Sequence, residues 1–148
     1  MKNIEIKLIN PQLTHKIRNE VLWPHKDLKD CMINEDLQSN TFHVGVFLNT
    51  EIISIGTFIK KTNNIFIDIK DQYRLRAMAT SKIHQGKSMG IKLIDFAINF
   101  LREKNMKLLW CDARKIAIPF YEKMGFKTHG DYYNIPKIGL HKLMYIYL

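Results

Sequence analysis

The hydrophobic pattern of the chain begins with a clean alternation of apolar and polar positions. Ile4, Ile6 and Leu8 share one face of an extended segment, and charged side chains occupy the other, which predicts a half-buried strand. From Pro11 the apolar positions recur about every four residues, and this predicts an amphipathic helix that ends before Pro24. The expected apolar face of that helix is Leu13, Ile17 and Val21.

The middle of the chain reads as strands separated by turns. Alternating positions over Phe42–Leu48 and Ile52–Ile59, with polar residues between them, predict a hairpin. An Asn-Asn pair marks a further turn before Ile65–Ile67 and a strand over Tyr73–Thr80. Residues 25–40 are polar with little periodicity, and we interpret them as a loop or a short helix.

The next part of the pattern predicts a helix, a strand and a second helix. After Ser88 the apolar positions follow a helical period. They are Gly90, Leu93, Ile94, Ala97 and Leu101. The apolar run Leu108–Cys111 predicts a buried central strand. We expect Asp112 to cap a helix that runs to Met124, in which Pro119 either produces a kink or marks where the regular part begins.

Two final strands, Lys127–Ile135 and His141–Leu148, complete the predicted order. This order of elements predicts an α/β fold with a mixed sheet and helices on its faces. The 148 residues contain no repeat or linker and match the size of one compact domain. We therefore expect a single domain over residues 1–148.

Composition limits the classes of protein that the chain can belong to. Apolar residues make up 46% of it, enough for an ordinary core. The N-terminus lacks the apolar stretch of a signal peptide, and no run approaches the ~20 residues of a membrane helix. Cys31 and Cys111 form no CxxC pair and are interpreted as reduced thiols. We expect a cytoplasmic protein that spans no membrane.

Charge leaves several partners open. Lys and Arg total 23 against 14 Asp and Glu, a formal net charge of +9. Such an excess is compatible with nucleic acid, with an anionic cofactor or with simple solubility. The basic residues are scattered, and adjacent pairs occur only at Lys60-Lys61 and Arg114-Lys115, which argues against nucleic acid. No HExxH motif or Cys/His cluster indicates a metal site.

A glycine-containing turn separates the strand ending at Thr80 from the helix after Ser88. Free N–H groups at a helix start, together with the helix dipole, favour a phosphate group there. Gly86 and Gly90 allow a ligand to approach the backbone closely. The turn is neither a P-loop nor a GxGxxG fingerprint, so by itself it also fits an ordinary strand–helix connection.

Five segments of the chain share their order and residues with one protein superfamily. They are IRNEVLWPHK (Ile17–Lys26), YRLRAMAT (Tyr73–Thr80), HQGKSMG (His84–Gly90), LLWCDARKIAIPFYEKMGF (Leu108–Phe126) and IPKIGLHKLM (Ile135–Met144). On these segments the chain resembles the GNAT superfamily of acetyl-CoA-dependent N-acyltransferases. The resemblance implies a mixed, mostly antiparallel central sheet with helices on both faces. It also implies acetyl-CoA as the acyl-donor cosubstrate, a small-molecule or peptide amine as the acceptor, and a homodimer.

The resemblance also implies which residues bind the donor. The pyrophosphate loop of the family, Gln/Arg-x-x-Gly-x-Gly/Ala, is matched by Gln85, Ser88 and Gly90. Ser88 departs from the usual glycine, so that its side chain either crowds the loop or adds a donor to phosphate. Lys82 and Lys87 are either ligands of the 3′-phosphate or solvated. The full set of donor-binding residues implied is Met78, Ala79, Thr80, Gln85, Gly86, Lys87, Ser88, Met89, Gly90, Asp112 and Phe120.

The same resemblance suggests the catalytic groups. Tyr121 matches the tyrosine that protonates the departing thiolate, and the N–H of Met78 is the expected oxyanion donor. His141 is a candidate base because histidine titrates in the right range, although ordered water can carry the proton instead. Glu20 is a second candidate, for binding a cationic acceptor. Asp112 stands where many relatives have asparagine, and it either contacts the pantetheine or only caps a helix.

Three functions remain open at this point. The first is an N-acetyltransferase that transfers acetyl directly to a primary amine in a ternary complex. The second is a protein of the same fold that binds acyl-CoA as a sensor without turnover, which the departures at Ser88 and Asp112 allow. The third, and least favoured, is a basic nucleic-acid-binding module.

Overall fold

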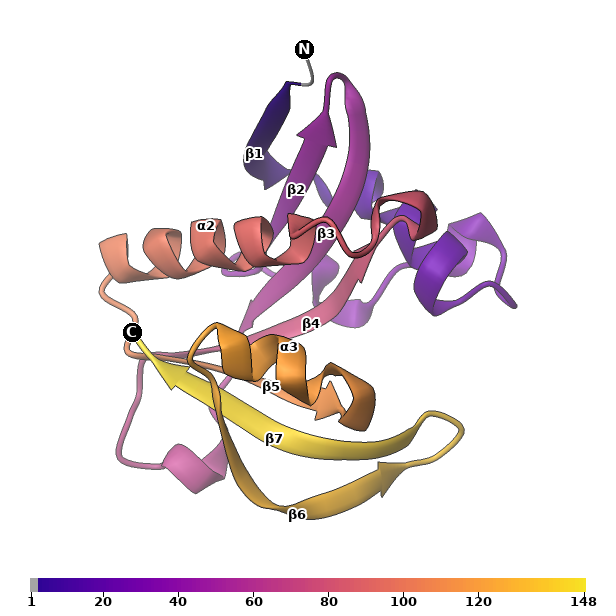
Figure 1. Ribbon diagram of the computed structural model, residues 1–148. Coiled ribbons are helices and arrows are strands. Elements are labelled where there is room, and N and C mark those ends of the chain that lie inside the picture. The colour runs from indigo at the N-terminus through magenta and orange to yellow at the C-terminus, as the bar shows by residue number, and fades with distance from the viewer. Residues whose placement is uncertain (1–2) are drawn as a thin grey trace.

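The protein is built around one seven-stranded sheet, seen here in a computed structural model that describes residues 3–148 (Figure 1). The strands are β1 (Ile4–Ile9), β2 (Phe42–Leu48), β3 (Glu51–Lys60), β4 (Gln72–Thr80), β5 (Leu108–Arg114), β6 (Lys127–Ile135) and β7 (Gly139–Tyr147). The α-helices are α1 (His15–Ile17), α2 (Met89–Glu103) and α3 (Ile118–Lys123). The strand order across the sheet is β1-β2-β3-β4-β5-β7-β6.

The parallel pair β4–β5 divides the otherwise antiparallel sheet into two halves. Its register joins Gln72 to Leu108, Tyr73 to Leu109 and Arg74 to Trp110, and then stops. Both strands continue, β4 to Thr80 and β5 to Arg114, so their later parts diverge (Figure 1). The predicted mixed, mostly antiparallel sheet is therefore confirmed, and the divergence opens it near the middle.

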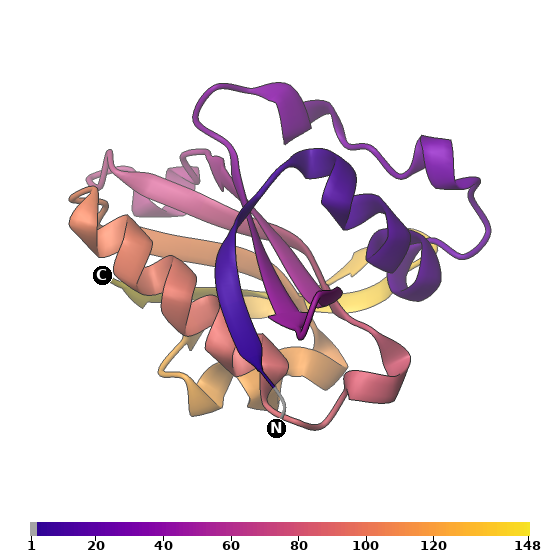
Figure 2. The ribbon, with the colours of Figure 1, turned by 90° about the horizontal axis from the view of Figure 1, so that it is seen from above.

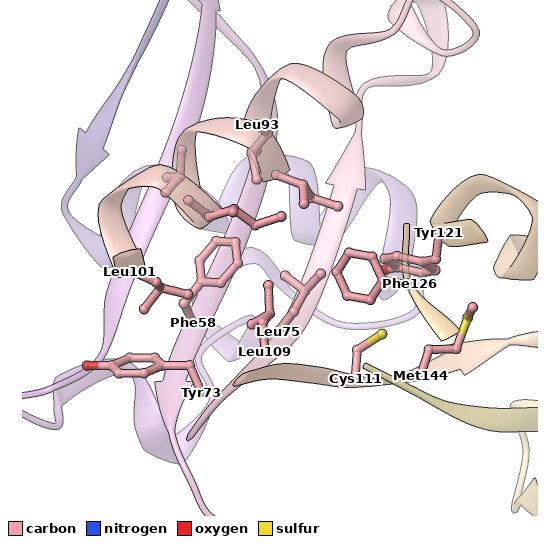
Figure 3. Close-up of a cluster of buried hydrophobic side chains, with 14 of the residues drawn as sticks. Phe58, Tyr73, Leu75, Leu93, Leu101, Leu109, Cys111, Tyr121, Phe126 and Met144 are labelled. Carbon is pink, nitrogen blue, oxygen red and sulfur yellow. The ribbon is translucent and has the colours of Figure 1, made fainter. Parts of the chain in front are cut away.

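Helix α2 covers one face of the sheet and provides much of the core. The face predicted from its period is confirmed. Its buried members are Gly90, Leu93, Ile94, Ala97, Ile98 and Leu101. They pack on Phe58, Leu75 and Leu109 from three neighbouring strands (Figure 3). A Cβ at Gly56 would lie 2.9 Å from Leu93 Cδ2, so glycine there lets the helix approach β3 closely.

The N-terminal helical segment lies over the other face of the sheet (Figure 2). It is less regular than the period predicted, because a 3₁₀ turn (Pro11–Thr14), α1 and a π-helical turn (Arg18–Leu22) follow one another. Ile17 is buried against the sheet, whereas Leu13 is exposed, so the predicted apolar face is wrong at that position. Residues 25–40 contain short 3₁₀ turns at Leu28–Asp30 and Asn34–Leu37.

A buried ion pair ties this segment to the sheet. Arg18 is fully buried and binds Asp36 through two hydrogen bonds, from Nη1 to Oδ2 at 2.7 Å and from Nη2 to Oδ1 at 2.8 Å. Arg18 also donates to the Cys31 carbonyl and to Thr57 Oγ1 on β3. Thr57 Oγ1 in turn lies 2.9 Å from Nδ1 of the buried His43. The network joins three separate parts of the chain.

The pKa values in this network follow from burial and charge. Burial raises the pKa of the Asp36 carboxyl, but hydrogen bonds from Arg18 and the Ile33 amide, together with the Arg18 charge, outweigh it, and the net pKa is lowered. Burial lowers the pKa of His43, only partly opposed by Asp36. Asp36 is therefore held ionised and His43 neutral near pH 7.

Two sequence predictions are wrong in the second half of the chain. Asp112 does not cap a helix, because β5 continues through it to Arg114. The helix expected up to Met124 is reduced to a 3₁₀ turn, Lys115–Ala117, followed by α3, and Pro119 sits in the first turn of α3. Nearer the middle of the chain, the turn expected at the Asn-Asn pair is a 3₁₀ turn over Asn64–Phe66.

Candidate active site

A cavity of about 900 Å³ occupies the space between the diverging ends of β4 and β5. Residues from α2, α3, β7 and the π-helical turn complete its walls. The sequence-predicted residues that line it are Met78, Ala79, Thr80, Gln85, Gly86, Ser88, Met89, Gly90, Asp112, Phe120, Tyr121 and His141. Lys87 is exposed and lies outside the lining, as do Lys82 and Glu20. The Glu20 carboxylate instead accepts a hydrogen bond from the Lys82 amide at 2.9 Å.

A bulge in β4 shapes the wall of the cavity. Pairing with β3 shifts between Ile55 and Thr57, and Ala77 adopts a left-handed φ of 53°. A β-bulge of this kind bends a strand and changes where the following residues point. Nothing in the sequence marks it, because Ala77 is not one of the residue types that favour a positive φ.

The turn after β4 leads into the start of α2. Gly86 and Ser88 both have positive φ, 76° and 65°. The Gln85 side chain donates to the Thr80 carbonyl at 2.9 Å, which ties the turn to the end of β4. Because α2 begins at Met89, its first amides have no carbonyl one turn back to accept from them. They face a site where the helix dipole favours an anion.

Gly90 lies in close contact with two other predicted site residues. A Cβ on Gly90 would lie 2.7 Å from Met78 Cε and 3.0 Å from Phe120 Cζ. Glycine at this position therefore lets the first turn of α2 pack against β4 and α3 together. The predicted donor-binding residues of three elements meet at this point.

Replacing Ser88 with glycine is expected to stabilise the protein. A left-handed conformation costs a residue with a Cβ about 1–2 kcal/mol, and the exposed Ser88 side chain makes no capping hydrogen bond in return. After the entropy cost of glycine, about 0.5–1 kcal/mol, we expect a gain of up to about 1 kcal/mol. Urea unfolding measures it. Ser88→Ala retains the Cβ and is the control, and an equal gain in that variant would contradict the explanation.

Tyr121 reaches the cavity from α3 and lies beside Cys111 of β5 (Figure 3). Only 8% of its surface is exposed. Burial raises the pKa of the Tyr121 hydroxyl well above its ordinary value, and the neighbouring Cys111 thiol adds to the effect. Burial also raises the pKa of Cys111. Both groups are therefore protonated at neutral pH, and the hydroxyl is able to donate a proton.

Asp112 is part of a polar cluster on the opposite face of β5 from Cys111. Its carboxylate accepts a hydrogen bond from Arg74 Nη2 at 2.8 Å and another from the Tyr133 hydroxyl. The Arg74 guanidinium also lies over the Trp110 ring. Burial, followed by the hydrogen bond to Asp112, raises the pKa of Tyr133. No local sequence pattern marks Arg74 or Tyr133, because their partner Asp112 is far away along the chain.

His141 lies on the same face as this cluster. Its Nδ1 is 2.8 Å from the Gly139 carbonyl, which can only accept, so Nδ1 carries the proton. In the neutral ring Nε2 is then free to accept a proton. The ring is buried and stacks on Tyr133, with centroids 6.2 Å apart. His141 is thereby held in one tautomer at the wall of the cavity.

Residues 3–148 contain neither a membrane-spanning helix nor a cluster of metal ligands. No helix there is long and apolar enough to cross a membrane. Over the same residues, no group of three or more His, Cys, Asp or Glu side chains is arranged to hold a metal ion.

The chain is similar to acetyltransferases in both sequence and fold. The model of the acetyltransferase (GNAT) domain matches residues 13–141. An uncharacterised N-acetyltransferase of Bacillus subtilis (strain 168), YitI, is 35% identical over 142 residues, which are 96% of this chain and 95% of the relative.

Solved structures agree in fold at lower identity. Escherichia coli ElaA is superposed with a TM-score of 0.77 at 16% identity, covering 97% of this chain and 99% of that one. The PaiA N-acetyltransferase of Thermoplasma acidophilum, solved with coenzyme A, gives 0.75 at 16% identity over 99% of both chains. A family model that covers most of the chain, a relative of nearly equal length and a shared fold lead to one conclusion. The chain belongs to the GNAT family of acetyltransferases.

Proposed function

We propose that the chain is a single N-acetyltransferase domain that moves the acetyl group of acetyl-CoA to a primary amine by direct attack. The observation that carries the proposal is the cavity between β4 and β5. Tyr121 and His141 line it from separate elements, next to an anion-binding helix start. A proton donor, a proton acceptor and a site for phosphate thus share one space.

The cavity suits the donor in several respects. Beyond Arg74, β4 no longer pairs with β5, so its backbone is available to an extended chain such as a pantetheine arm. The amides at the start of α2 suit the diphosphate. Gly86 has open space where a Cβ would be, which lets a ligand approach the turn closely. Acetyl-CoA supplies an activated thioester. Residues of this chain supply the proton for the thiolate, the base for the amine and the donor to the oxyanion.

In this proposal Tyr121 is the general acid. A thiolate with a pKa near 8.5 accepts a proton from a tyrosine of ordinary pKa near 10 at a cost of about 2 kcal/mol. Burial raises the pKa of Tyr121, but the departing thiolate forms in the same desolvated space. Its proton affinity rises as well, so the transfer does not become correspondingly more costly.

In this proposal His141 is the base. A lysine-like amine is mostly protonated at pH 7, and removing its proton costs about 4–5 kcal/mol. Nε2 of the oriented His141 ring is able to take that proton, directly or through water. The Met78 amide, next to the bulge at Ala77, is the proposed donor to the oxyanion.

Acetyl-CoA binding and thiol release together test this function. At 100 times its Kd, acetyl-CoA should stabilise the protein by about 2.7 kcal/mol, which raises Tm by about 5–10 °C. Release of free thiol should then depend on an added amine. A shift in Tm without thiol release from any amine would favour the sensor, and no shift at all would contradict both. A Tm shift with DNA alone would favour the nucleic-acid module.

A further inference from the structure

The arginines that line the cavity differ in whether the protein neutralises them. Arg74 is paired with Asp112 at 2.8 Å, and Arg76 is paired with Glu35 at 2.9 Å. Arg114, at the end of β5, also lines the cavity. Among the residues that the structure describes, no carboxylate pairs with its guanidinium. Among the described residues of the lining, Arg114 therefore lacks a built-in counter-charge, as does Lys123 of α3.

Arg114 is held next to His141 by the sheet register. The two residues are directly opposite each other on β5 and β7, so their side chains leave the same face a few ångströms apart. That face also carries Asp112 and Tyr133 and lies opposite the face that packs on α3. A group bound by Arg114 would therefore lie beside the proposed base.

The cavity lining offers little to a polycationic acceptor. Among the lining residues that the structure describes, the only carboxylate is that of Asp112, which is already bound by Arg74 and Tyr133. Glu20 faces the Lys82 amide outside the lining. An ammonium group would thus meet an unpaired guanidinium and no free carboxylate. An anionic group would instead find in Arg114 a fork of donors suited to carboxylate or phosphate.

We propose that the acceptor is an amine that also carries an anionic group, a carboxylate or a phosphate, which Arg114 binds while the amine lies beside His141. This rests on the proposed acetyltransferase function. The amine nitrogen forms a bond to the thioester carbonyl carbon, and the carbon–sulfur bond breaks. His141 takes each proton that nitrogen loses and passes it to solvent, and Tyr121 gives its proton to sulfur and regains one from solvent.

Apolar residues around the same cavity accommodate the body of such an acceptor. Val21, Leu22 and Trp23 contribute from the N-terminal segment, and Ile135 and Ile138 from the β6–β7 hairpin. An amino acid with an aliphatic side chain combines an amine, a carboxylate and an apolar body. Leucine and leucinamide share the apolar body and the position of the amine and differ in whether the second group is charged, so they are the matched probes, compared at equal concentrations of neutral amine.

Acceptor kinetics with matched amines test the proposal. Leucine should exceed leucinamide in kcat/KM by about 10-fold or more, since a hydrogen bond to a charged group contributes about 1.5–3 kcal/mol. A second comparison, of O-phosphoethanolamine with ethanolamine, tests a phosphate in the same way. The two comparisons together show whether the site accepts a carboxylate or a phosphate. Spermidine should be poorer than either anionic amine. Equal or higher kcat/KM for the neutral and polycationic amines would overturn the proposal.

The variant Arg114→Gln tests whether Arg114 causes the preference for an anionic amine. We expect this variant to reduce the preference for the anionic amine about 10-fold or more and to leave the KM for acetyl-CoA within about two-fold. Arg102→Gln removes the same charge from the exposed side of α2 and should retain the preference. If Arg114→Gln raised the KM for acetyl-CoA instead, Arg114 would be a ligand of the donor and the proposal would be wrong.

A binding measurement separates failure of this inference from failure of the proposed function. N-acetylleucine, the expected product, should raise the Tm of the CoA-saturated protein, and this shift should be lost in Arg114→Gln. Thiol release with every amine at background would refute the acetyltransferase function whatever N-acetylleucine does. Thiol release without an anionic preference, and without an Arg114-dependent shift, would refute only the present inference.

Discussion

Replacing Tyr121 with phenylalanine is expected to lower kcat by a factor of about 10²–10⁴, the usual contribution of a positioned general acid. The change removes one oxygen from a buried ring and leaves its packing against Phe120 and Phe126 in place. The KM for acetyl-CoA should change little, because the hydroxyl acts on the departing thiolate rather than on the bound donor. Steady-state thiol release, with acetyl-CoA and amine varied separately, measures both constants.

The matched control for this variant is Tyr73→Phe. Tyr73 is also buried, its pKa is also raised by burial, and its hydroxyl donates to the Asn40 carbonyl away from the cavity. Its loss should cost about 1 kcal/mol of stability and leave kcat within about two-fold. The raised pKa keeps Tyr121 protonated at pH 8–9. Deprotonation of Tyr121 should therefore cause no loss of activity in that range, either in the wild type or in Tyr73→Phe. Full activity of Tyr121→Phe would contradict the assignment.

Local periodicity was sufficient to predict most of the elements. The apolar face of α2 repeats with a helical period over 15 residues, and the hairpin of β2 and β3 alternates with polar residues between its strands. Both signals depend only on neighbours in the chain. The prediction that Asp112 caps a helix was wrong because it also used only local information. A residue type that caps helices occurs equally well inside a strand when its carboxylate has partners there.

The candidate site depends on contacts that local patterns do not encode. Asp112 receives hydrogen bonds from Arg74 and Tyr133, which lie 38 and 21 positions away in the chain. The place of Arg114 beside His141 follows from strand register. The bulge at Ala77 depends on how β4 pairs with β3. Local motifs contain most of the proposed donor-binding residues, whereas the proposed acceptor side depends on the three-dimensional pairing of strands.

Replacing Arg18 with methionine is expected to destabilise the protein by about 3–5 kcal/mol, because it leaves the buried Asp36 carboxylate without its cation. Asp36 is 4% exposed, so solvent has little access to replace the two lost hydrogen bonds. The loss is a large part of the 5–15 kcal/mol that stabilises a typical domain. Urea unfolding at pH 7, followed by circular dichroism, measures it.

Two further variants separate burial of the charge from simple loss of an arginine. Arg76→Met also removes an arginine from an ion pair, the one with Glu35. Because the Arg76 side chain is 38% exposed, this change should lower the free energy of unfolding by less than about 1 kcal/mol. Arg18→Met combined with Asp36→Leu removes both charges and should recover most of the stability. Thr57 and His43 retain their mutual hydrogen bond in that double variant.

The pH dependence gives an independent check on the origin of the loss. In the wild type the pKa of Asp36 is lowered, so its contribution to stability is present above the unfolded pKa near 3.8 and disappears as pH falls below it. Without Arg18, burial raises the pKa of the same carboxyl, and the group takes up a proton in the folded state as pH falls. The difference in stability between wild type and Arg18→Met should therefore be largest near pH 7 and should shrink toward pH 4. A difference that stayed constant over this range would assign the loss to packing around the arginine rather than to an uncompensated charge.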